Sequence, residues 1–276
     1  MQTNDGNWWS LSWNVAPGCT KVSDACQNCW AEVMARRLQG MNKPGYEGLV
    51  NEHGRWSGKV NLLENRLDSV LHLQRPRVIA VNLMGDLFHP NVPEDFIKKV
   101  FLIMTAAYWH TFMVLTKRPE RAVEVFKTIG QKPLKHIWFG ATAENQSSTN
   151  KRWSSMAWMA QEGWKTWVSS EPRLEMINWH GWEFLKVLAS GGETGPYARP
   201  MNPNWMRADR DWCLAHGIEF HFKSWGDWGP EVAGMDLSNY PMTTFGDEIV
   251  FRFGKKQTGR LLDDFIFDGW MEQVMI

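Results

Sequence analysis

Short apolar runs rich in β-branched and aromatic residues alternate with longer helical patterns along most of this chain. The predicted strands are 8–13, 77–84, 111–115, 136–140, 165–169, 185–189 and 218–222. The predicted helices are 30–38, 93 to about 108, 119–129, 149–161 and 204–216. Strands that alternate with helices pair in parallel, so the pattern predicts an α/β fold, a partial or complete parallel β/α (TIM-like) barrel.

No low-complexity linker interrupts this alternation, and a barrel in a chain of 276 residues can bury one sizeable core. After about residue 225, Gly, Pro and Asp become frequent and the apolar runs shorten, as in 248–253. We therefore expect a barrel over 1–225 and a small extension, 226–276, packed on it. Its basic residues Lys255, Lys256 and Arg260 could meet phosphates, although a solvated loop is the simpler interpretation.

Polar residues follow the predicted strands at the point where each one ends. They include Asp86 and His89, Lys117 and Arg118, Thr142, Glu144 and Asn145, Ser170 and Glu171, Gly191, Gly192 and Glu193, and Lys223 with Trp225. In a β/α barrel the carboxyl ends of the strands open onto one face, where catalytic groups gather. A helix cap or a solvated loop explains any one of these residues, but their recurrence favours a functional face.

Three of the four cysteines, Cys19, Cys26 and Cys29, lie within eleven residues after the first predicted strand. In a reducing compartment, clustered cysteines bind metal or perform redox chemistry more often than they form disulfides. Three thiolates can hold three irons of a [4Fe-4S] cluster and leave the fourth open for S-adenosylmethionine (SAM). The remaining cysteine, Cys213, has no obvious partner.

Two other interpretations of the cysteines stay open. A structural zinc site needs a fourth ligand, and the nearest candidate, His53, lies far outside ordinary zinc-finger spacing. A non-catalytic binding protein could also use a zinc or cluster loop only to staple its fold. The charged residues at the strand ends argue against that second interpretation.

Composition limits the possible partners. Thirty basic and thirty acidic side chains cancel, so a polyanionic substrate would need a local patch. The chain shows neither a basic and apolar leader nor a run of about 18 apolar residues, so we expect a cytoplasmic protein without a membrane segment. The eighteen tryptophans are more simply explained by core and cleft packing than by a base-stacking platform.

Ten ordered segments resemble the phage Gp37/Gp68-like family, a divergent branch of the radical SAM superfamily. The matching residues are Trp13-Asn14 with Gly18-Cys19, Lys21 to Ser23, Cys26 to Glu32, Asp86 to His89, Leu115 to Pro119, Trp138 to Gly140 with Glu144-Asn145, Ser170 to Pro172, Gly191 to Glu193, Phe222-Lys223 with Trp225-Gly226, and Gly254 to Lys256 with Gly259-Arg260. Most radical SAM proteins space their cysteines C-x3-C-x2-C with an aromatic residue before the third. Here six residues separate Cys19 from Cys26, and Asn28 takes the place of that aromatic residue, with Trp30 nearby.

The resemblance implies a mechanism and a set of roles. Cys19, Cys26 and Cys29 would hold the cluster, and an electron from an external reductant would cleave SAM to a 5′-deoxyadenosyl radical that abstracts a substrate hydrogen. Asp86 is expected to meet the SAM amino group. Trp30, Glu171, Gly191, Gly192 and Glu193 are expected to bind the cofactor. Lys117, Arg118 and Lys223, which suit an anionic substrate, and Glu144 are the expected catalytic residues.

The family's frequency in phages suggests a nucleobase of phage DNA, or a nucleotide, as the substrate. The favoured reaction is thymidine hypermodification, in which an isomerase or mutase rearranges an amino-acid group on a thymine-derived base. A radical SAM lyase that repairs a damaged pyrimidine pair is the alternative. The expected setting is the cytoplasm of a bacterium or of a phage-infected host.

Overall fold

The computed structural model describes residues 6–269, which form two compact units. The first, called here the N-terminal unit, contains residues 9–141 and 152–166. The second, the C-terminal unit, contains residues 6–8, 142–151 and 167–269. Within the described residues, no helix combines the length and apolar character needed to cross a membrane.

Seven of the strands form one sheet whose spatial order follows the chain. These strands are β1 (Leu11–Trp13), β2 (Val78–Val81), β3 (Thr111–Thr116), β4 (Ile137–Thr142), β5 (Lys165–Ser170), β6 (Val187–Gly191) and β7 (Glu219–Ser224). Neighbours pair in parallel from β1 to β4 and from β5 to β7. Sequential parallel strands with β1 and β7 at the edges confirm the predicted α/β class in its partial-barrel form.

The helices also lie close to the predicted positions. They are α1 (Trp30–Gly40), α2 (Glu94–Ala106), α3 (Pro119–Ile129), α4 (Gln146–Gln161) and α5 (Pro203–His216). Helix α3 begins and ends where predicted, because Pro119 suits the first turn and Gly130 adopts the left-handed conformation that closes a helix. The 3-10 segment η2 (Glu64–His72) was not predicted.

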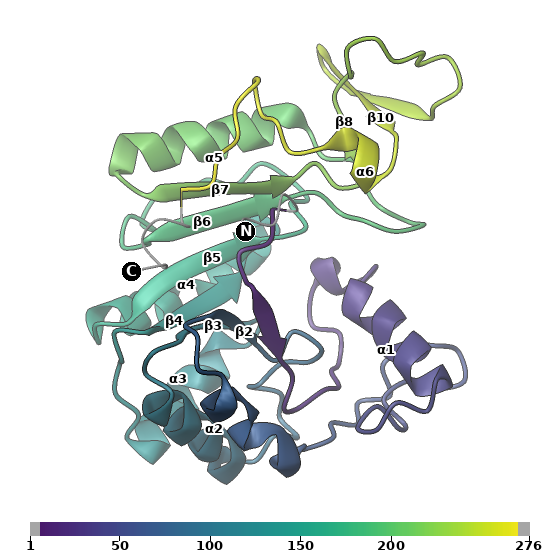
Figure 1. Cartoon of the computed structure of the whole chain (residues 1–276). Helices are drawn as coiled ribbons and strands as arrows, with labels where there is room; N and C mark the ends of the chain where they lie inside the picture. The colour runs from purple at the N-terminus through teal and green to yellow at the C-terminus, as the bar shows by residue number, and fades with distance from the viewer. Residues whose placement is uncertain (1–5, 270–276) are drawn as a thin grey trace. The chain divides into compact units, whose positions relative to one another are not determined.

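Aromatic side chains form the core of the N-terminal unit. The rings of Phe126 and Trp164 stack with centroids 4.9 Å apart, and Phe101 meets the edge of Phe126 at 5.0 Å. Helices α2 and α3, which carry Phe101 and Phe126, lie side by side (Figure 1). Burial of such rings supports the packing interpretation of the aromatic residues.

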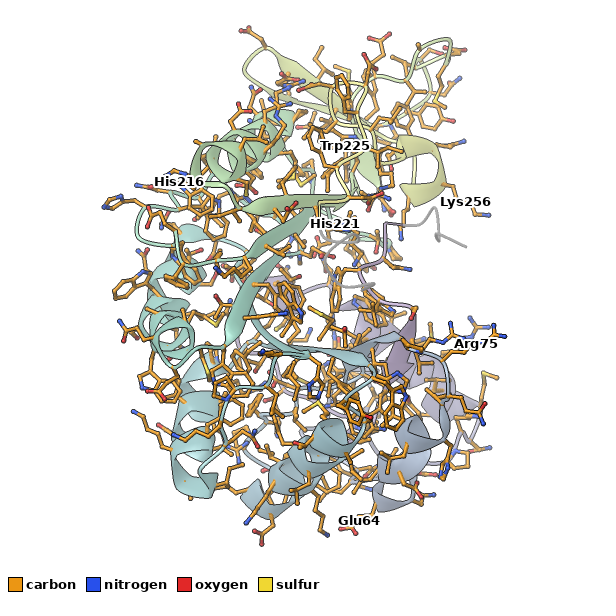
Figure 2. All side chains as sticks on the ribbon, turned by 60° about the vertical axis from the view of Figure 1, so that its left-hand side comes forward. Glu64, Arg75, His216, His221, Trp225 and Lys256 are labelled. Carbon is orange, nitrogen blue, oxygen red and sulfur yellow. The ribbon has the colours of Figure 1, made fainter. Side chains whose placement is uncertain are left out.

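In the C-terminal unit, α5 runs along β6 and β7, with His216 in its last turn (Figures 1 and 2). A separate three-stranded sheet, in the order β8 (Trp228–Gly229), β10 (Glu248–Arg252) and β9 (Met242–Phe245), lies within the predicted extension. The short helix α6 (Lys255–Thr258) follows it. The division at residue 225 stays a prediction.

A buried ion pair joins α5 to the sheet in the C-terminal unit. Arg173 Nη2 lies 2.8 Å from Asp209 Oδ1, and both side chains are fully buried. Asp209 also accepts hydrogen bonds from Trp179 Nε1 at 2.7 Å and from Ser190 Oγ at 2.8 Å. Burial raises the pKa of Asp209, and Arg173 and the two hydrogen bonds oppose that shift.

We predict that Asp209→Ala lowers the free energy of unfolding by about 3–5 kcal/mol, because it leaves the Arg173 charge buried without its partner. Chemical denaturation measures the change. Asp211→Ala is the matched control on the same helix: Asp211 pairs with its neighbour Arg210 and is largely exposed, so its loss should cost less than about 0.5 kcal/mol. Equal losses in the two variants would contradict the prediction.

Candidate functional site

The three clustered cysteines lie between β1 and α1 in the N-terminal unit. Cys26 ends a short 3-10 turn, and Cys29 is the residue that precedes the first turn of α1. All three are free thiols; Cys26 is buried, and the other two are half-buried. A helix N-terminus favours negative charge, so the position of Cys29 suits a thiolate.

Arg118 reaches this loop from the start of α3. Its Nη1 lies 3.8 Å from Cys19 Sγ and 2.9 Å from Asp86 Oδ2. Its Nη2 donates to the carbonyl oxygen of Thr20 at 3.1 Å and to Thr20 Oγ1 at 2.8 Å. The sequence predicted Arg118 as a residue that meets an anionic substrate. The structure shows that Arg118 contacts the cysteine loop, and its expected contact with a substrate stays a prediction.

Asp86 is buried and accepts hydrogen bonds from several segments of the N-terminal unit. Besides Arg118, its donors are Phe88 N at 3.0 Å, Thr116 Oγ1 at 2.7 Å and Lys117 N at 3.1 Å. Of the predicted site residues, the structure therefore brings Cys19, Asp86, Lys117 and Arg118 together. The expected contact between Asp86 and a SAM amino group stays a prediction.

Glu32 on α1 holds the other side of the cysteine loop. Its buried carboxylate lies 3.2 Å from Lys21 Nζ and 3.0 Å from Arg55 Nη1, and it accepts the backbone N–H of Trp56 at 3.0 Å. These contacts join the loop, α1 and the following turn. The predicted site omitted Glu32 and Thr20, although both lie in or beside the cysteine motif.

The protonation of Cys19 follows from its surroundings. The pKa of the Cys19 thiol is raised to about 11, chiefly by burial and also by the nearby Asp86 charge, while Arg118 opposes the shift. Without a metal, the thiol is therefore protonated near neutral pH. A metal that binds this sulfur must displace the proton, so metal binding at this site is coupled to proton release.

The chemistry of the donors fits an iron–sulfur cluster. The loop offers three sulfur atoms, the donor type that holds such clusters, and a guanidinium lies beside one of them. Over residues 6–269, no group of three or more His, Cys, Asp or Glu side chains converges on a metal-ion position. Cys213 lies in the C-terminal unit on α5, where burial raises its thiol pKa.

The C-terminal unit contains a second pair of predicted site residues. Lys223, in β7, forms an ion pair with Glu171, which directly follows β5. Glu171 also accepts hydrogen bonds from Trp8 Nε1 at 3.3 Å and from Ser169 Oγ at 3.3 Å. The side chains of Glu171 and Lys223 are 13% and 20% exposed, so both remain partly accessible to a ligand.

The glycines after β6 pack against the chain itself. A Cβ at Gly192 would lie 1.8 Å from the carbonyl oxygen of Trp225, a residue that follows β7 (Figure 2). Glu193 is buried and pairs with Arg199, with 2.6 Å between Oε1 and Nη2. This packing accounts for Gly192 and Glu193 without a ligand, and their expected cofactor contacts stay predictions, as does that of Gly191.

The remaining predicted residues differ in exposure. Glu144 is fully buried, and its backbone N–H donates to Ser148 Oγ at 3.1 Å at the start of α4. Trp30 is 48% exposed in the first turn of α1. Lys256 is exposed on α6 (Figure 2), whereas Arg260 pairs with Asp268.

His89 also contacts Thr20, through its ring nitrogen Nε2. Its Nδ1 accepts the backbone N–H of Asn91 at 3.1 Å, so the neutral ring carries its proton on Nε2, 3.0 Å from Thr20 Oγ1. Burial, together with the nearby Arg118 charge, lowers the pKa of His89 to about 4. The folded protein therefore keeps this ring neutral at pH values where an unfolded chain protonates it.

We predict that His89 contributes to a loss of stability on acidification. Between about pH 6.5 and pH 4 the unfolded chain binds a proton that the folded state excludes, so the free energy of unfolding falls by up to about 1.4 kcal/mol per pH unit. His89→Gln should reduce this slope, because glutamine keeps an N–H donor but does not titrate. Denaturation at several pH values tests it, and identical slopes in both proteins would refute it.

The sequence and the structure were compared with those of known proteins. No curated protein matches the sequence. Similar solved structures include "Spore photoproduct lyase complexed with dinucleoside spore photoproduct" (10% identity, TM-score 0.47) and a mutant of that lyase "with bound AdoMet and dinucleoside spore photoproduct" (11% identity, TM-score 0.45). Each match covers 95% of this chain and 73% of the other, and these TM-scores are too low to establish a shared fold.

The family match spans nearly the whole sequence. Residues 4–270 match the family described as "Protein of unknown function (DUF5131)". Both compact units and all three clustered cysteines lie within this match. The chain therefore belongs to the DUF5131 family of proteins of unknown function.

Proposed function

We propose that this protein is a radical SAM enzyme whose Cys19, Cys26 and Cys29 hold a [4Fe-4S] cluster. The observation that carries the proposal is the loop of three free thiols after β1, with the guanidinium of Arg118 beside Cys19 Sγ. When bound, the cluster and SAM supply the one-electron chemistry that activates an unreactive C–H bond. The resemblance to the phage Gp37/Gp68-like family supports the same assignment.

The residues around the loop then have defined tasks. Arg118 and Glu32 fix its two sides, through Thr20 and Lys21 respectively. The N-terminus of α1 favours negative charge at Cys29. These contacts hold the ligands in place, which is the protein's main contribution when a cofactor performs the difficult chemistry.

Glu171 and Lys223 are the proposed ligand-binding groups of the C-terminal unit. A carboxylate accepts hydrogen bonds from hydroxyl or ammonium groups, and an ammonium binds an anionic group. Because the two side chains already pair, a polar ligand would exchange with that ion pair and would not meet desolvated charges. Lys117 and Glu144 stay candidate catalytic residues.

The proposed substrate is a modified nucleobase of phage DNA, with rearrangement of an amino-acid group as the reaction. The resemblance to the phage family supports this choice. The net charge of zero gives no general attraction to DNA, so a local basic segment such as Lys255 and Lys256 would have to contribute. Repair of a damaged pyrimidine pair is the alternative reaction.

We predict that anaerobic reconstitution gives about four irons per chain and the broad visible absorbance of thiolate-bound clusters. Replacing Cys19, Cys26 or Cys29 with alanine should remove nearly all of this iron. Cys213→Ala is the matched control and should retain it, because Cys213 lies in the other unit. Stoichiometric zinc without iron, in protein purified away from oxygen, would overturn the proposal.

We also predict that the reconstituted protein, reduced with dithionite, converts SAM to methionine and 5′-deoxyadenosine, and does so faster with the correct substrate present. Phage DNA, ultraviolet-irradiated DNA and free nucleotides are the test substrates, and mass spectrometry of released nucleosides identifies the product. An unchanged nucleoside mass with altered retention indicates an isomerase, whereas restored pyrimidines indicate a lyase. S-adenosylhomocysteine as the only SAM product would instead indicate methyl transfer.

A further inference from the structure

Arg118 lies 99 positions along the chain from Cys19, yet its guanidinium contacts the loop at several points. It approaches Cys19 Sγ to 3.8 Å and donates two hydrogen bonds to Thr20. The side chain is only 7% exposed, and that of its partner Asp86 is 6% exposed. The positive charge therefore lies close to the sulfur, and the guanidinium that carries it is almost shielded from water.

The Arg118 guanidinium is held in position by residues outside the cysteine loop as well as by the loop. Asp86 is fixed by Phe88 N, Thr116 Oγ1 and Lys117 N, none of which belongs to the loop. Thr116 Oγ1 also accepts the backbone N–H of Arg118 at 2.9 Å. The guanidinium is thus held from the β3 side, and its direction toward Cys19 is preorganised.

Charge near a cluster ligand affects how readily the cluster accepts an electron. Reduction adds negative charge that is shared with the cysteine sulfurs, so hydrogen bonds and positive charge beside them favour the reduced state. An arginine keeps its charge at any pH at which a protein is folded. A buried carboxylate at the same place has the opposite effect.

We propose that Arg118 and Asp86 act as an opposed charge pair on the Cys19 sulfur, in which Arg118 raises the reduction potential of the cluster and Asp86 lowers it. Arg118 is then a positioning residue for the cluster and not a substrate-binding residue. This inference rests on the proposed function, because it requires a cluster on Cys19. The inference goes beyond the proposed function, because three cysteines alone do not imply that a neighbouring ion pair sets the reduction potential.

The test is a redox titration of the reconstituted wild-type protein and of the Arg118→Gln and Asp86→Asn variants. Electron paramagnetic resonance follows the reduced cluster, so only chains that carry a cluster contribute to the signal. Arg118→Gln should make reduction at least tenfold less favourable, a shift of about 59 mV to more negative potential for one electron. Asp86→Asn should shift the potential in the positive direction.

The two variants separate electrostatics from packing. Both break the same ion pair, so a merely structural role would move both potentials in the same direction or change only iron retention. Arg118→Lys keeps the charge while losing the paired hydrogen bonds to Thr20, and it should restore most of the wild-type potential. If Arg118→Gln does not fold, the direction of the Asp86→Asn shift still tests the inference.

Arg121 supplies the matched control on the same helix. It donates to the backbone oxygens of His89 and Val92 and has no hydrogen bond to Cys19 or Thr20 among those of the described residues. Arg121→Gln should lower stability and leave the potential unchanged. Absence of a cluster in the wild-type protein would refute the proposed function. A wild-type cluster with the same potential in Arg118→Gln and Asp86→Asn would refute this inference alone.

Discussion

The buried carboxylate of Asp86 joins the segment after β2 to the β3–α3 connection through hydrogen bonds, and it binds Arg118, which in turn contacts the cysteine loop. A buried carboxylate is costly unless several donors surround it, and here backbone N–H groups, a hydroxyl and a guanidinium share that task. Because Arg118 depends on Asp86 for its countercharge, the position of Cys19 depends on Asp86 as well. The geometry of the candidate cluster site therefore depends on Asp86, a residue that would not itself bind the cluster.

The C-terminal unit also contains a buried ion pair between an aspartate and an arginine, but that pair stabilises the fold. Asp209 and Arg173 are completely buried, and their remaining partners are an indole N–H and hydroxyl groups. These contacts join α5 to the sheet, and among the described residues the hydrogen-bond partners of the pair include no thiol. The Arg118 guanidinium, by comparison, keeps contacts to a loop of potential metal ligands. The two buried ion pairs are therefore alike in themselves and differ in their neighbours. The Arg173–Asp209 pair contacts groups that stabilise the fold, whereas the Arg118–Asp86 pair lies beside a potential metal ligand.

The sequence predicted the elements whose signals are local. Apolar runs located the seven strands, and the Pro119 start of α3 was read directly from the chain. The cysteine loop was equally visible because its members lie within eleven residues. The segment η2 was missed because Leu63, the residue before it, makes no side-chain capping hydrogen bond, so the usual sequence signal for the start of a helix is absent there.

Side-chain partners were much harder to predict. The contacts of Arg118 were not predicted, because Asp86 and Cys19 lie 32 and 99 positions away along the chain, and its expected contact with a substrate stays a prediction. The close approach of the Trp225 backbone to Gly192 was not predicted either, and the expected ligand contact of Gly192 stays a prediction. Both residues were correctly placed at strand ends. Their contacts depend on tertiary packing, which a single sequence does not encode in its local pattern.

The proposed function requires that three cysteines hold a cluster with one iron left open for SAM. Mössbauer spectroscopy of the protein reconstituted with iron-57 tests this most directly, since it reports each iron environment separately. We expect that SAM changes the signal of about one iron in four and leaves the signals of the others unchanged. A cluster whose spectrum does not respond to SAM, or a protein that binds no iron, would contradict it.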